Sequence, residues 1–186
     1  MLLDRDGRSI WIGTSYNNYN NYHEPRIVHF DGDTVKKRIT ENDGLPSGTV
    51  TAIARDSSGN LWFASWSSDH YGGIAVLHNK KLTKYLKAKY LKDRDGKWLE
   101  FGGCNALFVG KSGIVWAHSS NGIARFDGDS WKLFDSVTVS LDLPYARYSH
   151  IVQDTSGMVC GTEGTSVNYG SGLLAYKDNR WYQFTT

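Results

Sequence analysis

The sequence repeats itself at intervals that suit four short strands. Its clearest unit opens with an alternating stretch at residues 50–55, a turn at 56–59 and a second apolar stretch at 61–64. Two further strand-like segments, 73–77 and 82–85, follow with a polar turn between them. Alternating apolar residues bounded by Asp, Ser and Gly are typical of strands joined by tight turns. The unit therefore predicts one antiparallel four-stranded sheet.

Glycines in the first turn of each unit mark the period of the repeat. They are Gly7, Gly59, Gly113 and Gly157, spaced 44 to 54 residues apart. Four-stranded units at this period are typical of β-propeller blades, and the strand periodicity excludes helical solenoid repeats. We therefore predict an all-β chain that forms a single domain of four blades. The expected blades are about 1–40, 45–90, 104–136 and 148–186 within the domain 1–186.

The first blade is predicted to lack most of its innermost strand. Asp4 and Gly7 have the same spacing as Asp56 and Gly59, so the chain begins at the position that Ile53 holds in the second blade. An open arc of blades would expose the apolar faces of its terminal sheets. We therefore expect a partial propeller that self-association or further blades complete. A ring of two chains with eight blades, or truncation from a longer propeller, is preferred to a closed monomer.

Tryptophan recurs in the second strand of three blades, at positions 11, 62 and 116. Such residues could serve as flat platforms for a ligand. Because they stand at equivalent positions in the repeat, we predict instead that they fill the space between neighbouring sheets.

The composition excludes several classes of function. The 21 basic and 19 acidic residues are mixed along the chain and give a net charge of +2, so no nucleic-acid or membrane-surface partner is indicated. No run of 18 apolar residues occurs. Cys104 and Cys160 form no C-x-x-C pair, and the six His residues show no local metal-binding spacing. We predict no metal, no cofactor and no catalytic residue; the compartment does not follow from composition.

Several motifs resemble the two-component regulator propeller repeat. The second blade carries Gly-Leu-Pro, Gly-Asn-Leu-Trp and Gly-Gly-Ile, and the third carries Gly-Ile and Phe-Asp-Gly, at 44–46, 59–62, 72–74, 122–123 and 126–128. The resemblance implies a large propeller in the periplasmic or extracellular sensor part of a hybrid two-component regulator. It also implies a role in signal transduction, often the sensing of polysaccharide breakdown products. It transfers no ligand residue to a numbered position.

The connections between the predicted strands lie on two opposite faces of the propeller. In an antiparallel blade, the turns joining strands one to two and three to four lie on one face, and all other connections lie on the opposite face. Tight turns make up the first set. The second set is long, at 15–24, 66–71 and 163–169, and the blade-to-blade connections 85–105 and 135–150 share its face. We call this second face the long-loop face.

The long-loop face is rich in Tyr, Trp, Asn, Asp and His, which suits a polar ligand such as an oligosaccharide, or a partner protein. Ordinary solvated connections explain the same composition equally well. The residues predicted to contact a ligand are Tyr19, Tyr22, Trp66, His70, Tyr71, Asn105, His118, Tyr148, His150 and Tyr169.

Two alternatives to a binding module remain open. In the first, the chain is a propeller-type lyase or hydrolase in which His118, His150 and Glu163 converge near the central channel. In the second, it is a structural fragment whose only partners are further blades.

Overall fold

The computed structural model describes residues 1–15, 27–67, 72–84, 90–110, 112–119, 121–134, 147–154, 158–163 and 172–185. Regular structure in these segments is β-strand, apart from the short 3-10 helix η1 at Glu41–Asp43. None of the helices found among the described residues is long and apolar enough to span a membrane.

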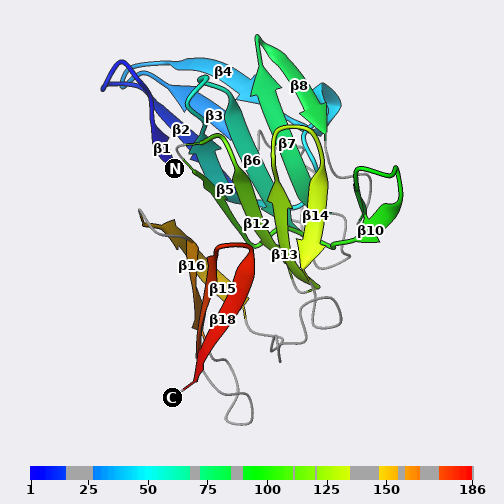
Figure 1. The fold of residues 1–186 in the computed structure, drawn as a ribbon. Helices are drawn as coiled ribbons and strands as arrows, with labels where there is room; N and C mark the ends of the chain where they lie inside the picture. The colour runs from blue at the N-terminus through cyan, green and yellow to red at the C-terminus, as the bar shows by residue number, and fades with distance from the viewer. Residues whose placement is uncertain are drawn as a thin grey trace.

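Four antiparallel four-stranded sheets follow one another along the chain, as predicted (Figure 1). Blade 1 consists of β1 (Leu2–Leu3), β2 (Ile10–Gly13), β3 (Ile27–Phe30) and β4 (Val35–Ile39). Blade 2 consists of β5 (Thr49–Arg55), β6 (Leu61–Trp66), β7 (Gly73–His78) and β8 (Lys81–Lys84). Blade 3 consists of β11 (Ala106–Val109), β12 (Val115–Ser119), β13 (Gly122–Phe126) and β14 (Trp131–Phe134). Blade 4 consists of β15 (Arg147–Gln153), β16 (Met158–Glu163), β17 (Gly172–Lys177) and β18 (Arg180–Thr185).

The innermost strand of blade 1 is short, as the repeat phase predicts. β1 contains two residues, whereas β5, its equivalent in blade 2, contains seven. The pairs Leu2–Trp11 and Leu3–Ile10 set its register. Blade 1 therefore contacts blade 2 through β2 and β5, while β5, β11 and β15 contact one another in succession.

A fifth, two-stranded sheet corrects one sequence expectation. Residues 85–105 were predicted to be a long loop, but β9 (Tyr90–Lys92) and β10 (Trp98–Glu100) pair as a hairpin within it. Leu91 and Phe101 are fully buried in the core between blades 2 and 3. The hairpin is therefore part of that interface, and Figure 1 shows it beside β14.

Apolar cores fill the spaces between successive blades. The three second-strand tryptophans are buried in these cores, as predicted: Trp11 between blades 1 and 2, Trp62 between blades 2 and 3, and Trp116 between blades 3 and 4. Because successive side chains of a strand point to opposite faces, one sheet contributes to both of its neighbouring cores.

An aspartate at the end of the innermost strand binds the indole of the second strand in two blades. Trp11 Nε1 donates a hydrogen bond of 2.9 Å to Asp4, and Trp62 Nε1 donates one of 3.0 Å to Asp56. At Asp56, burial alone would raise the carboxyl pKa, but the hydrogen bonds from Trp62 and Asn60 outweigh it and lower the pKa. These bonds anchor the turn to the inter-blade core.

Blade 3 departs from this arrangement because Gly110 replaces the aspartate. A Cβ on Gly110 would overlap Oε1 of Gln153 from blade 4, so Gln153 occupies the space that an aspartate would need. Within the described segments, Trp116 Nε1 has no hydrogen-bond acceptor. Gln153 ends β15 of blade 4, as Arg55 ends β5 of blade 2. Arg55 donates a hydrogen bond to Asp4 of blade 1, the blade that precedes its own.

Candidate functional site

Trp66 ends β6 on the long-loop face and is supported by glycine backbone. A Cβ on Gly103 would lie 2.9 Å from Cδ1 of Trp66, so the indole rests directly on the Gly103 backbone. A Cβ on Gly48 would overlap the Trp66 carbonyl, and one on Gly72 would overlap the Ser65 carbonyl. Backbone from three separate loops thus closes around this strand end. The Trp66 side chain is held in place and remains 38% exposed.

Hydrogen bonds fix the chain segment beneath Trp66 to both neighbouring blades. The Cys104 N–H donates to the Ser65 carbonyl at 2.9 Å, and the Thr51 hydroxyl donates to the Cys104 carbonyl at 2.7 Å. Asn105 N–H donates to the His118 carbonyl at 2.7 Å. The structure therefore brings Trp66 and the half-buried Asn105, two of the predicted site residues, to the same end of blades 2 and 3.

His118 is enclosed, contrary to the expectation that it contacts a ligand on this face. It pairs with Ala106 across β11 and β12, and its side chain is only 1% exposed. Burial lowers the pKa of His118 to about 3, so the imidazole is neutral at physiological pH. It shares its side of β12 with Trp116, and its cross-strand partners Ala106 and Ile123 belong to the core between blades 3 and 4.

The other predicted residues are only partly described. Tyr148 and His150 lie in β15, where His150 pairs with Gly161 through the backbone, but their side chains are outside the description. Glu163, invoked for the enzymatic alternative, pairs with Arg147 across the same two strands. Five predicted residues lie outside the described segments: Tyr19, Tyr22, His70, Tyr71 and Tyr169. Within those segments, no group of three His, Cys, Asp or Glu residues could hold a metal ion.

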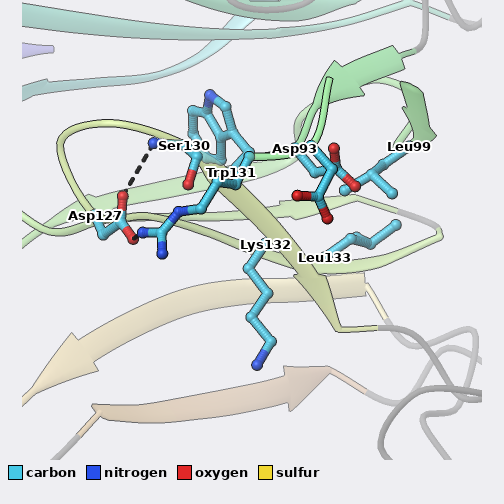
Figure 2. Close-up of a pocket in the computed structure, with 9 residues that line it drawn as sticks. Asp93, Leu99, Asp127, Ser130, Trp131, Lys132 and Leu133 are labelled. Carbon is cyan, nitrogen blue, oxygen red and sulfur yellow. Dashed lines mark hydrogen bonds and ion pairs between the residues drawn. The ribbon is translucent and has the colours of Figure 1, made fainter. Parts of the chain in front are cut away.

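A groove beside the β9–β10 hairpin is a second concave site, which sequence reasoning missed. Its volume is about 380 Å³, within the range of small-molecule pockets. Figure 2 shows it between the hairpin and β14. Its lining residues are Asp93, Arg94, Asp95, Leu99, Asp127, Ser130, Trp131, Lys132 and Leu133. The missed signal was Asp95-Gly96, a dipeptide typical of hairpin turns between two strands.

The groove has an apolar base and charged edges. Asp127 accepts hydrogen bonds from the N–H groups of Ser130 and Asp129, at 3.0 and 3.2 Å, and these bonds lower the pKa of its carboxyl. Arg94 approaches the other Asp127 oxygen at 3.4 Å and links the hairpin to blade 3. The Trp131 ring is buried, so it offers no face for stacking. The groove can accommodate a polar organic molecule through its charged edges.

The four sheets, the buried tryptophans and the repeated turns define a repeat protein of the β-propeller type. Residues 44–67 match the model of a family described as two component regulator propeller. No curated protein matches the sequence.

Solved structures of similar fold come from B. thetaiotaomicron. One is the extracellular domain of BT4673, described as a hybrid two component system, with a TM-score of 0.67 and 13% identity, covering 98% of this chain and 22% of that one. Another is the extracellular domain of BT3049, described in the same way, with a TM-score of 0.58 and 17% identity, covering 99% of this chain and 27% of that one. At sequence identities this low, the likeness shows a shared fold alone. The chain spans about a quarter of the length of these two structures, 22% of one and 27% of the other.

Proposed function

We propose that this chain is part of a sensor-type β-propeller of a two-component regulator, located outside the cytoplasm, and that it binds a ligand rather than transforming one. The repeat at residues 44–67 supports this proposal, as does the fold shared with extracellular domains of proteins described as two component systems. The burial and the neutral state of His118, one member of the catalytic group considered above, also support this proposal. Incubating the bound ligand with the protein and analysing it for products tests the non-enzymatic assignment; turnover would overturn it.

The ligand we propose is a carbohydrate on the long-loop face, and the observation that carries this proposal is the supported, partly exposed indole of Trp66. An aromatic ring presents an apolar face to the apolar face of a sugar ring, and its rigidity reduces the entropy lost on binding. The Gly103 backbone behind the ring holds the ring in place. Asn105 at the same end supplies amide groups for hydrogen bonds to hydroxyls.

A glycan screen followed by calorimetric titration of the best oligosaccharide tests this proposal. We expect Trp66→Ala to weaken binding by a factor of about 10 or more, as loss of a central aromatic contact does. Trp98→Ala is the matched control, because Trp98 is 48% exposed but lies on the β9–β10 hairpin. Equal affinities for the wild type and Trp66→Ala would contradict the assignment of this face.

The groove beside β14 is a second candidate position for the same ligand. Asp127→Asn would remove a negative charge from the edge of the groove without changing the size of the side chain. Weakened binding in Asp127→Asn together with unchanged binding in Trp66→Ala would place the ligand in the groove. The reverse result would place it on the long-loop face.

A further inference from the structure

The groove beside the β9–β10 hairpin follows the open edge of blade 3. β14 is the outermost strand of its sheet, and the hairpin forms a separate two-stranded sheet. Four consecutive residues at the start of β14, 130–133, line the groove. Successive side chains of a strand point to opposite faces, and Figure 2 shows Trp131 and Lys132 on opposite sides of β14. A groove that reaches both faces of a strand passes along its backbone edge.

The register of β13 and β14 shows which backbone groups face this edge. Opposite residues in an antiparallel pair alternate between hydrogen-bonded and non-hydrogen-bonded pairs. The Asp127 N–H donates to the Ser130 carbonyl at 3.3 Å, so this first pair is hydrogen-bonded. Counted along the register from there, Lys132 lies in a hydrogen-bonded pair and Leu133 in a non-hydrogen-bonded pair. The N–H and the carbonyl of Leu133 therefore point away from β13, and no backbone hydrogen bond reaches them from the other described segments.

β14 lacks the charged residues that protect other outer strands of this chain. Lys or Arg fills three of the five positions in β4 and two of the four in β8, the outer strands of blades 1 and 2. Such charges hinder the pairing of an exposed edge with another strand. In β14 only Lys132 is charged, and its ammonium lies 5.1 Å from the centre of the Phe134 ring, which packs toward blade 4. The edge at Leu133 is therefore open to pairing.

The hairpin side of the groove carries negative charge beside an apolar base. Asp93 and Asp95 line it, and neither forms an ion pair within the described residues. Asp127, at the opposite edge, already has its ion pair. Leu99 and Leu133 form the apolar base and pack against the core between blades 2 and 3. A Lys or Arg side chain fits this arrangement, because its aliphatic stem can pack on the leucines while its cation meets the carboxylates.

We propose that this groove binds an extended basic peptide of a partner protein, which pairs with β14 as an added antiparallel strand of blade 3. Main-chain hydrogen bonds supply affinity in this mode of recognition, and side-chain contacts supply specificity. The peptide residue opposite Leu133 exchanges two hydrogen bonds with it. Directly opposite residues share a face of the sheet, so a Lys or Arg at this position points toward Asp93 and Asp95.

This surface involves neither terminal blade and does not rest on the proposed carbohydrate. Its nine lining residues all belong to the hairpin and to blade 3, which lies between blades 2 and 4 in the chain. Trp66 is not among them. Trp66→Ala is therefore expected to bind the peptide as the wild type does, whatever its effect on a carbohydrate.

A pentapeptide with uncharged ends, acetyl-Thr-Val-Lys-Val-Thr-amide, is the probe, because its β-branched residues favour an extended chain. Calorimetric titration should show binding. Methylation of the lysine backbone nitrogen should weaken binding by a factor of about 10 or more, because it removes the donor to the Leu133 carbonyl. Methylation of the following valine nitrogen is the control, since that N–H points away from β14. Absence of binding, or equal weakening by the two methylations, would overturn the proposal.

Two neutral variants test the charge of the hairpin side. Asp93→Asn/Asp95→Asn should weaken binding of the lysine peptide by a factor of about 5 to 10. Asp33→Asn/Asp178→Asn is the matched control, because it removes the same charge from exposed turns of blades 1 and 4. Equal affinities of the two double variants would contradict the role of the hairpin carboxylates.

Amide hydrogen exchange, followed by nuclear magnetic resonance, locates the added strand. At saturating peptide, exchange of the Leu133 N–H should slow several-fold, because the peptide covers it. Exchange of the Lys132 N–H should stay the same, because that group is already bonded to β13. Unchanged exchange at Leu133 with bound peptide would overturn the pairing with β14.

Discussion

Replacing Asp4 tests how the turns hold neighbouring blades together. Its carboxylate accepts hydrogen bonds from the Arg5 N–H at 2.7 Å, Trp11 Nε1 at 2.9 Å and Arg55 at 2.6 Å, and it pairs with His29 at 3.0 Å. Burial would raise its pKa, but the hydrogen bonds from Arg5 and Trp11 and the charges of Arg55 and His29 outweigh that effect. The pKa is therefore lowered, and Asp4 is ionised at neutral pH.

The cost of losing this carboxylate follows from its partners. In Asp4→Ala the buried Trp11 indole loses its acceptor, which costs about 1–3 kcal/mol. The Arg55 bond is charge-assisted and joins blades 1 and 2, with both side chains less than 20% exposed; such bonds contribute about 1.5–3 kcal/mol. Because water replaces part of both interactions, we expect the free energy of unfolding to fall by about 3 kcal/mol.

Urea denaturation at pH 7, followed by tryptophan fluorescence, measures this change. Asp127→Ala is the matched control, because its ion pair with Arg94 is 3.4 Å long and the Arg94 side chain is 71% exposed. An exposed pair of this kind contributes about 1 kcal/mol or less. Equal losses in Asp4→Ala and Asp127→Ala would refute the reasoning that the Asp4 cluster joins the blades.

Three further predictions concern blades 2 to 4. Gly110→Asp combined with Gln153→Arg should give blade 3 the two interactions that Asp4 makes in blade 1, a hydrogen bond from the indole and an ion pair with the arginine of the next blade. We expect the free energy of unfolding, measured by urea denaturation, to rise by about 1 kcal/mol. A double variant less stable than Gly110→Asp alone would count against this expectation. The pKa of His118 falls from 6.5 to about 3 on folding. Between these two pH values the unfolded chain binds more protons than the folded one, so the free energy of unfolding should decrease as pH falls from 6.5 toward 3. Nuclear magnetic resonance should show a neutral His118 ring at pH 5, and a protonated ring at that pH would contradict its burial. Leu91→Ala should lower the free energy of unfolding by about 3 kcal/mol in urea denaturation, because Leu91 is fully buried. Arg94→Ala, on the same hairpin, should lower it by less than about 1 kcal/mol. Similar losses in the two variants would show that the hairpin is only a surface loop.

The four sheets were predictable because their signals are local. Strand alternation recurs in every blade and the Asp-to-Gly turn in blades 1, 2 and 4, so the phase of the repeat also predicted the short β1. The β9–β10 hairpin was missed because its strands contain three residues each within a lysine-rich stretch. Its stability depends on burying Leu91 between blades 2 and 3, a contact that no local pattern encodes.

The candidate site was only partly predictable for the same reason. Trp66 was expected to be accessible because it begins a long loop, and it is. Its support by Gly103 joins segments that are far apart in sequence and depends on how two blades meet. His118 was placed correctly at the end of a second strand, but it lies on the side of that strand that faces the core between blades 3 and 4, and it is buried.

The most direct test of the proposed function is a nuclear magnetic resonance titration of protein labelled with 15N at tryptophan. The seven tryptophans give seven indole signals, and the spectrum of Trp66→Phe assigns the one from Trp66. On addition of the best-binding oligosaccharide, we predict that the Trp66 signal shifts with ligand concentration while that of Trp98 stays in place. An unchanged Trp66 signal at saturating ligand would contradict binding on the long-loop face.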